Sequence, residues 1–70
     1  MTRLSRTVTI VNQKGLHARA SAKFVTFVSR LPDGLLVEVE KDGQSVTGSS
    51  IMGLMMLGAA KGSDIVIHVA

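Results

Sequence analysis

The amino-acid sequence predicts an α+β fold, an open-faced β-sandwich in which helices cover one face of a four-stranded antiparallel sheet, in the order β-α-β-β-α-β. Four segments alternate apolar and polar residues, as strands with one buried face do. Two segments between them carry apolar residues at helical spacing. The chain has 70 residues, 46% of them hydrophobic and none of them cysteine. Residues 1–70 are therefore expected to form one small domain without disulfides.

The first strand is predicted at residues 7–11, where Val8 and Ile10 share the buried face. From His17 onward the apolar residues recur every three or four positions, which predicts an amphipathic helix. The Pro-Asp-Gly sequence at residues 32–34 ends this helix and turns the chain, because proline disfavours helical geometry in the residue before it.

The middle of the chain predicts a β-hairpin. Residues 35–40 alternate in character, with Val37 and Val39 on the buried face, and residues 44–47 form the partner strand. The Asp-Gly pair at residues 42–43 is typical of the tight two-residue turn that joins such strands.

A second, short helix and a last strand complete the fold. The run Ile51–Leu57 follows two serines, either of which is a suitable helix cap. Within this run Leu54 and Leu57 are expected to point inward. Residues 64–70 alternate again and predict the final strand, with Ile65, Ile67 and Val69 buried.

The charge pattern disfavours nucleic acid and membrane as partners. The net charge is +3, but the eight basic residues are spread singly along the chain rather than clustered. The two aromatic residues, Phe24 and Phe27, are predicted on the buried face of the first helix, which leaves little for base stacking. No secretory signal is visible, and the longest apolar run, residues 51–60, is too short to span a bilayer. We expect a cytoplasmic protein.

His17 is the residue best placed for chemistry. It follows a Gly-Leu pair and opens a helix, where unpaired backbone N–H groups favour a negative group. An imidazole exchanges its proton near neutral pH, so it offers a neutral ring nitrogen as a nucleophile toward phosphorus. The guanidinium of Arg19 lies two residues away and suits phosphate recognition.

Other chemistry has less support. No carboxylate lies near His17 in the sequence to complete a triad, and no second histidine stands at metal-ligand spacing, so we expect neither a metal site nor a cofactor. A helix-opening histidine can also be a simple cap. The second histidine, His68, is expected to be a solvent-facing residue of the last strand.

Two segments together carry a resemblance to a known family. Residues 15–25, Gly-Leu-His-Ala-Arg-Ala-Ser-Ala-Lys-Phe-Val, resemble the active-site segment of the HPr family, the histidine-containing phosphocarrier proteins of the bacterial phosphoenolpyruvate:sugar phosphotransferase system. Residues 50–55, Ser-Ile-Met-Gly-Leu-Met, are similar to that family's regulatory-serine segment. The resemblance spans residues 7–70.

The resemblance implies a phosphocarrier that is not an enzyme with its own turnover. His17 would accept a phosphoryl group at Nδ1 from phosphorylated Enzyme I and pass it to an Enzyme IIA-type domain, with Arg19 stabilising the transferred group. Ala20 departs from the proline that most members have there. The Ala-Ser-Ala-Lys-Phe-Val segment is similar to the nitrogen-related branch, so the output is sugar transport or metabolic and nitrogen regulation.

The second segment implies regulation and docking. Ser50 would be the target of the family's kinase/phosphorylase, and the added charge would spoil an apolar docking surface for which Ile51, Met52 and Met55 are the candidates. An alternative function is a non-catalytic regulator that docks through residues 51–57, with His17 only a cap.

The resemblance also bears on the end of the chain. The family has a further C-terminal helix after the last strand, so we expect a domain truncated at residue 70. The sheet face that this helix would cover, next to Phe24, Phe27, Ile65 and Ile67, is then expected to be exposed. Self-association through that face and marginal stability are the expected consequences.

Overall fold

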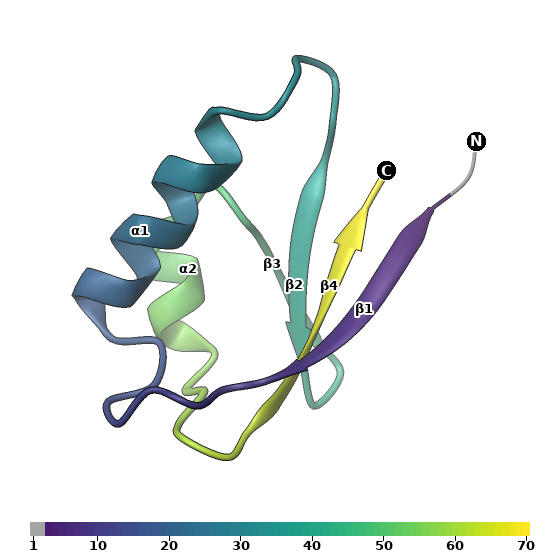
Figure 1. Cartoon of the computed structure of the whole chain (residues 1–70). Helices are drawn as coiled ribbons and strands as arrows, with labels where there is room; N and C mark the ends of the chain where they lie inside the picture. Colours follow the sequence, from purple (N-terminus) through teal and green to yellow (C-terminus); the bar gives the residue numbers. More distant parts are fainter. Residues whose placement is uncertain (1–2) are drawn as a thin grey trace.

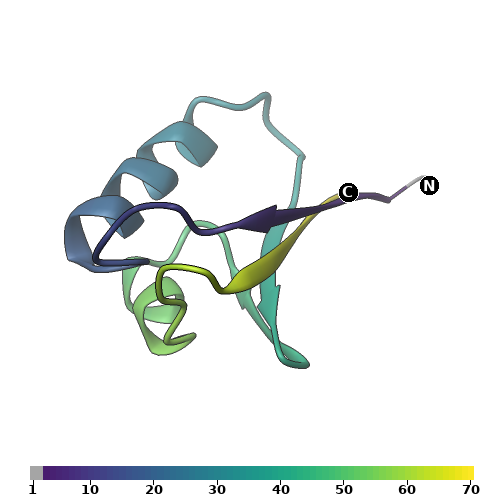
Figure 2. The same ribbon diagram turned by 60° about the horizontal axis from the view of Figure 1, so that its bottom comes forward.

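The computed structural model describes residues 3–70 and has the predicted elements in the predicted order (Figure 1). The strands are β1 (Leu4–Thr9), β2 (Val37–Lys41), β3 (Gln44–Thr47) and β4 (Asp64–Val69), and the helices are α1 (Ala18–Ser29) and α2 (Ile51–Met56). Every strand pair is antiparallel, and the order across the sheet is β1-β4-β2-β3. Both helices lie on one side of the sheet (Figure 2). The predicted α+β open-faced sandwich is confirmed.

The core lies between α2 and the central strands. Leu54 of α2 and Val39 of β2 are fully buried, and Leu57 and Ile65 are nearly so. These side chains form one apolar cluster, against which Phe24 of α1 packs from the side. The inward orientation of Leu54 and Leu57 that the sequence predicts is confirmed.

The β2–β3 hairpin is built by a turn with two left-handed residues. Asp42 has a φ of 51° and Gly43 a φ of 83°. Positive φ at both central residues defines the turn type that matches the right-handed twist of paired strands. The register follows from it, with Lys41 opposite Gln44 and Val39 opposite Val46.

The boundaries of β1 and β2 differ from the sequence prediction, and β4 ends one residue earlier, at Val69. The first strand begins at Leu4 and ends at Thr9, because β4 offers partners for all six of these residues. Ile10 leaves the sheet and bonds to the loop before β4, with its N–H donating to the Ser63 carbonyl at 2.8 Å. Ile10 is buried as expected, whereas Val8 is exposed, so the prediction for Val8 is wrong. Strand β2 begins at Val37 rather than at residue 35.

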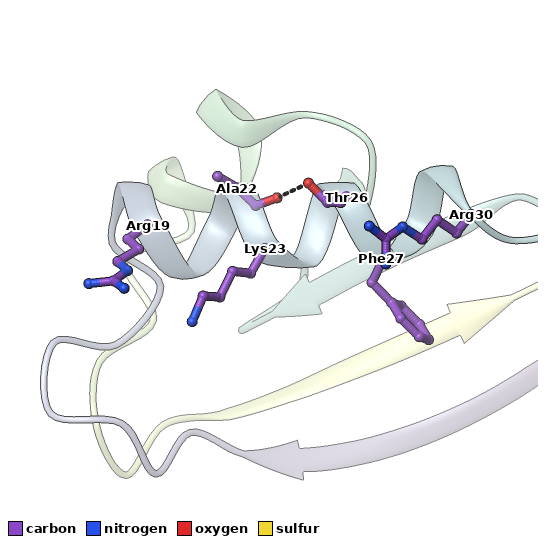
Figure 3. Close-up of a pocket in the computed structure, with 6 residues that line it drawn as sticks. All are labelled: Arg19, Ala22, Lys23, Thr26, Phe27 and Arg30. Atoms are coloured by element: carbon purple, nitrogen blue, oxygen red, sulfur yellow. Dashed lines mark hydrogen bonds between the residues drawn. The ribbon is translucent and has the colours of Figure 1, made fainter.

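The predicted burial of Phe27 is also wrong. Its side chain is 63% exposed, although the helical spacing predicts burial. Helix α1 packs against α2, and Phe24 is partly buried against the core. Phe27 extends from α1 on the side of the strands (Figure 3). Since α1 and β1 do not close together there, the phenylalanine ring stays in contact with solvent.

Of the four residues beside which the sequence places the exposed sheet face, Phe27 is exposed and the other three are covered to different degrees. Leu4 and Val8 pair with Val69 and Ile65 and so share the helix-side face of the sheet, yet both are exposed. Ile65 is buried in the core, and Phe24 and Ile67 are partly buried against it. We call Leu4, Val8 and Phe27 the β1 patch. None of the helices within residues 3–70 is both long and apolar enough to cross a membrane.

Candidate functional site

His17 is the N-cap residue of α1. Its backbone is extended, with a φ of −78° and a ψ of −179°, and the helix begins at the next residue. The ring atom Nδ1 accepts a hydrogen bond from the backbone N–H of Arg19 at 3.3 Å. A ring nitrogen that accepts carries no proton, so the lone pair of Nδ1 is directed at the helix N-terminus. Free N–H groups there favour negative charge.

The loop before His17 is held by a second loop from the other end of the chain. The N–H of Leu16 donates to the Ala59 carbonyl at 2.9 Å, and Asn12 Nδ2 donates to the Gly15 carbonyl at 2.7 Å. Gly15 has a φ of 62°, and a Cβ built on it would lie 2.2 Å from the Ala59 oxygen. Only glycine fits, because any side chain here would push the two loops apart.

A buried serine fixes the first turn of α1. Ser21 is fully buried, and its Oγ donates to the Leu16 carbonyl at 3.3 Å. Its backbone N–H donates to the His17 carbonyl at 2.9 Å. The residues on both sides of the imidazole are therefore anchored, and the ring itself is left half-buried at the surface.

A surface hollow surrounds the imidazole. It is lined by Asn12, His17, Arg19, Ala20 and Lys23. Arg19 and Lys23 are one helical turn apart and project from the same side of α1 (Figure 3). The structure thus brings His17 and Arg19 together, as the sequence predicts, and adds a second cation. Ala20 occupies the first turn of α1, where alanine supports the helix.

A second hollow continues along α1. Its lining consists of Arg19, Ala22, Lys23, Thr26, Phe27 and Arg30 (Figure 3). Within it the Thr26 hydroxyl donates to the Ala22 carbonyl at 2.9 Å, so that hydroxyl serves the helix itself. This side of α1 therefore presents positive charge and one exposed aromatic ring, and it carries no acidic residue.

Helix α2 begins at Ser50, whose Oγ accepts a hydrogen bond from the N–H of Gly53 at 2.9 Å. The neighbouring Ser49 bonds instead to the Thr47 hydroxyl at 3.0 Å. Of the two candidate caps, the structure selects Ser50. Its hydroxyl lies at the start of a helix, where a phosphate would also be tolerated.

Apolar side chains of α2 point away from the core. Ile51, Met52 and Met55 are exposed, as expected for docking candidates, with Met52 at 71%. Met56 is 78% exposed and belongs to the same surface, although the sequence did not single it out. Helices α1 and α2 pack against each other, so this surface and His17 belong to one layer of the molecule.

His68 lies apart from this site and is not a free surface residue. It alternates with Ile65 and Ile67 and therefore points from the open face of the sheet. Its side chain is 14% exposed, with Nδ1 2.6 Å from the Ser5 hydroxyl and Nε2 2.9 Å from Glu40 Oε1. The predicted place of His68 on the open face of the sheet is confirmed, but the ring is largely covered, because two cross-strand neighbours hold it.

Two residues that line the His17 hollow, Asn12 and Lys23, were not predicted from the sequence. Asn12 begins the loop and acts through its side-chain amide, which donates to the Gly15 carbonyl; this contact has no sequence signature beyond a polar residue near glycine. Lys23 was detectable, because it stands four residues after Arg19 and shares its helix face. Within the described residues 3–70, no group of three or more potential metal ligands comes together.

Comparison with protein families gives a match over nearly the whole chain. A family model described as the PTS HPr component phosphorylation site matches residues 4–70. The phosphocarrier protein HPr of Pseudomonas putida is 47% identical over 64 residues, which cover 91% of this chain and 70% of the relative. The phosphocarrier protein NPr of Shewanella violacea is 38% identical over 68 residues, which cover 96% of this chain and 71% of the relative.

Solved structures show the same fold. A crystal structure of the phosphocarrier protein HPr from Bacillus anthracis superimposes with a TM-score of 0.90 at 34% identity, covering all of this chain and 81% of that one. HPr-C-His from Thermoanaerobacter tengcongensis gives a TM-score of 0.83 at 39% identity, covering 91% of this chain and 70% of that one.

Proposed function

The chain belongs to the HPr family of phosphocarrier proteins of the phosphotransferase system, and from this premise we propose that His17 is its phosphoryl acceptor. The observation that carries the proposal is the hydrogen bond from the Arg19 N–H to Nδ1 of His17 at 3.3 Å. It marks Nδ1 as the unprotonated nitrogen and places it beside the N–H groups that a phosphoryl oxygen can use.

The transfer needs little from the carrier. The lone pair of His17 Nδ1 attacks the phosphorus of a phosphohistidine on Enzyme I. The new N–P bond forms as the N–P bond of the donor breaks. The electron pair of the broken bond returns to the imidazole ring of the donor histidine. The phosphoryl oxygens then meet the N-terminus of α1 and the guanidinium of Arg19. Positioning and charge stabilisation account for the catalysis, because phosphoryl transfer requires little covalent chemistry from the protein beyond the attacking nitrogen.

The same geometry allows the group to leave. His17 is half-buried in an open hollow rather than enclosed. Stabilisation of an anion at a helix N-terminus is about 0.3–1 kcal/mol at exposed sites, which is modest compared with a transfer potential. An Enzyme IIA-type domain can therefore take the group from the same side. The chain acts in this proposal as a carrier without turnover of its own, in the cytoplasm, and without a cofactor.

Docking uses the exposed side chains of α2. Ile51, Met52 and Met55 provide apolar contact area, and methionine adapts to partners of different shape. The basic residues Arg19 and Lys23 on the adjoining helix favour acidic partner surfaces. We assign Enzyme I and Enzyme IIA-type domains to this surface. The physiological output is sugar transport or metabolic and nitrogen regulation.

Ser50 is the proposed residue through which phosphorylation would regulate docking on this surface. A kinase/phosphorylase of the family would add about −1.5 to −2 charges at the start of α2. The helix N-terminus tolerates such charge, but apolar docking next to it does not. Phosphorylation of Ser50 would therefore weaken partner binding and leave the fold intact.

The test is transfer of labelled phosphate from phosphoenolpyruvate through Enzyme I. Wild type should gain one phosphate that is acid-labile and alkali-stable, and His17→Ala should gain none. His68→Gln is the matched control, because it removes the other histidine and should still be labelled. Labelling of His17→Ala at the wild-type level would overturn the assignment, and intact partner regulation in that variant would favour the docking-only function.

A further inference from the structure

Two positive side chains face the His17 hollow from one side of α1. Arg19 and Lys23 are four residues apart and line the same hollow as the imidazole. In the close-up both project from the same side of the helix (Figure 3). Like charges at this spacing repel each other and weaken a helix. Their arrangement is therefore unfavourable unless something negative lies between or beside them.

No acidic side chain supplies that negative charge in the part of the chain that the structure describes. The ion pairs of residues 3–70 are Arg3–Glu38 and Lys41–Asp42, and Glu40 contacts His68; all of these lie on the sheet or its hairpin. The first turn of α1 contains no acidic residue. Arg19 and Lys23 therefore share a hollow with the ring of His17, and no acidic side chain lines it.

We infer that Lys23 is a second phosphoryl-binding residue, which acts with Arg19 on the group carried by His17. This inference rests on the proposed function. The guanidinium offers paired donors to two oxygens, whereas the ammonium is a compact charge on a flexible stem that reaches a third oxygen. A phosphoryl dianion relieves the repulsion between the two cations. Lys23 thereby sets how strongly the carrier retains its phosphoryl group against its donors and acceptors.

The effect should be visible in the transfer equilibrium. Neutralising Lys23 removes a favourable contact that exists only in the phosphorylated state. In Lys23→Gln the equilibrium between phospho-Enzyme I and the phosphorylated carrier should shift toward phospho-Enzyme I by about two- to fivefold, the range for an exposed charge pair. Lys23→Arg keeps the charge and should stay close to wild type. High salt should reduce the difference between wild type and Lys23→Gln.

A matched control removes one charge from the same helix. Arg30 is the C-cap residue of α1 and lines the second hollow but not that of His17. Arg30→Gln should therefore leave the equilibrium unchanged. In ³¹P spectra the phosphohistidine signal should titrate at a higher pH in Lys23→Gln than in Arg30→Gln, because the missing cation no longer favours the dianion. A purely structural role of Lys23 would not move this midpoint.

The outcomes separate the two proposals. If wild type accepts no label at His17, the proposed function fails. If wild type is labelled and Lys23→Gln matches Arg30→Gln in both equilibrium and ³¹P midpoint, only the role of Lys23 is overturned. An equal loss in Lys23→Gln and Lys23→Arg, measured on folded protein with unchanged circular dichroism, would also overturn it, because charge would then not be the cause.

Discussion

His17 performs two tasks that use the same atom. Its Nδ1 caps α1 by accepting from the Arg19 N–H, and the same lone pair is the proposed nucleophile. In the proposed function, phosphorylation would remove the lone pair but put phosphoryl oxygens in its place, and these would accept from the same N–H groups. The start of α1 therefore has a cap before and after transfer. A carrier built in this way changes its charge without changing its fold.

Gly15 occupies a position at which the site cannot accommodate any side chain. Gly15→Ala should unfold more easily, because a positive φ costs an alanine about 1–2 kcal/mol and the Cβ would press against the Ala59 carbonyl. The matched control is Gly34→Ala, since Gly34 also has a positive φ but has no neighbour within 4 Å. We expect Gly15→Ala to lose about 1–3 kcal/mol more than the control.

Urea unfolding followed by circular dichroism measures this difference. Labelling by phospho-Enzyme I should also drop in Gly15→Ala and remain normal in Gly34→Ala, because only the first substitution separates the two loops beside His17. Equal stability of the two variants would show that the loop contact does not matter.

At the scale of elements, α2 combines a buried face, an exposed face and a polar start. Leu54 and Leu57 are anchored in the core, so the helix has a fixed rotation. That rotation presents Met52, Met55 and Met56 to solvent. Ser50 lies at the point where this exposed face begins, so a change in its charge would act directly on the proposed docking surface.

Substitutions at Ser50 can separate capping from charge. Ser50→Asp should keep the stability of the protein within about 0.5 kcal/mol, because aspartate caps helices as well as serine does. It should slow phosphoryl transfer from Enzyme I, because a negative charge enters the docking surface. Ser50→Asn caps without charge and should retain both properties, whereas Ser50→Ala should lose about 1 kcal/mol of stability.

Thermal unfolding measures the effect of each substitution on capping, and the rate of phosphoryl transfer from Enzyme I measures the effect of charge on docking. Transfer that is slowed equally in Ser50→Asn and Ser50→Asp would refute the charge mechanism and point to shape instead.

At the scale of the whole molecule, the helices leave the β1 patch in contact with water. Leu4, Val8 and Phe27 lie on the helix side of the sheet but are exposed. Exposed large apolar residues favour association, and in this patch Arg6 lies between Leu4 and Val8 on the same face of β1. We expect concentration-dependent self-association through this patch, with Phe27→Ser shifting the protein toward monomer. Since Phe27 is 63% exposed, this substitution should change stability little.

Sedimentation equilibrium over a range of concentrations tests this. Met52→Ser is the control, because Met52 is similarly exposed but belongs to α2. If both variants dissociate equally, or if wild type is monomeric throughout, the patch does not mediate association.

Much of this molecule is predictable from local patterns. The order of the elements, the Asp42-Gly43 turn and the inward face of α2 follow from periodicity and turn chemistry. The site of His17 and Arg19 follows as well, because both residues lie on one continuous segment. Long-range contacts explain what was missed. The boundaries of β1 depend on β4, and the burial of His68 depends on Ser5 and Glu40 from other strands.

Phe27 illustrates a different limit. Helical spacing identifies an apolar face but does not say how far a neighbouring layer extends over it. Lys23 shows the reverse case. Its place beside Arg19 is visible in the spacing. Its role becomes apparent only once the structure shows that no acidic side chain of the described residues pairs with either cation.

The pairing of β1 with β4 affects how the protein folds during its synthesis on the ribosome. These strands come from opposite ends of the described chain, and the loop that supports Gly15 also precedes β4. Contacts between such distant segments form late, because nearly the whole chain must first be closed into a loop. During synthesis the segment around His17 leaves the ribosome early but lacks its support until residues 59–69 have followed. We therefore expect nascent chains to be poor phosphoryl acceptors, and the capacity to accept phosphate to appear together with cooperative folding.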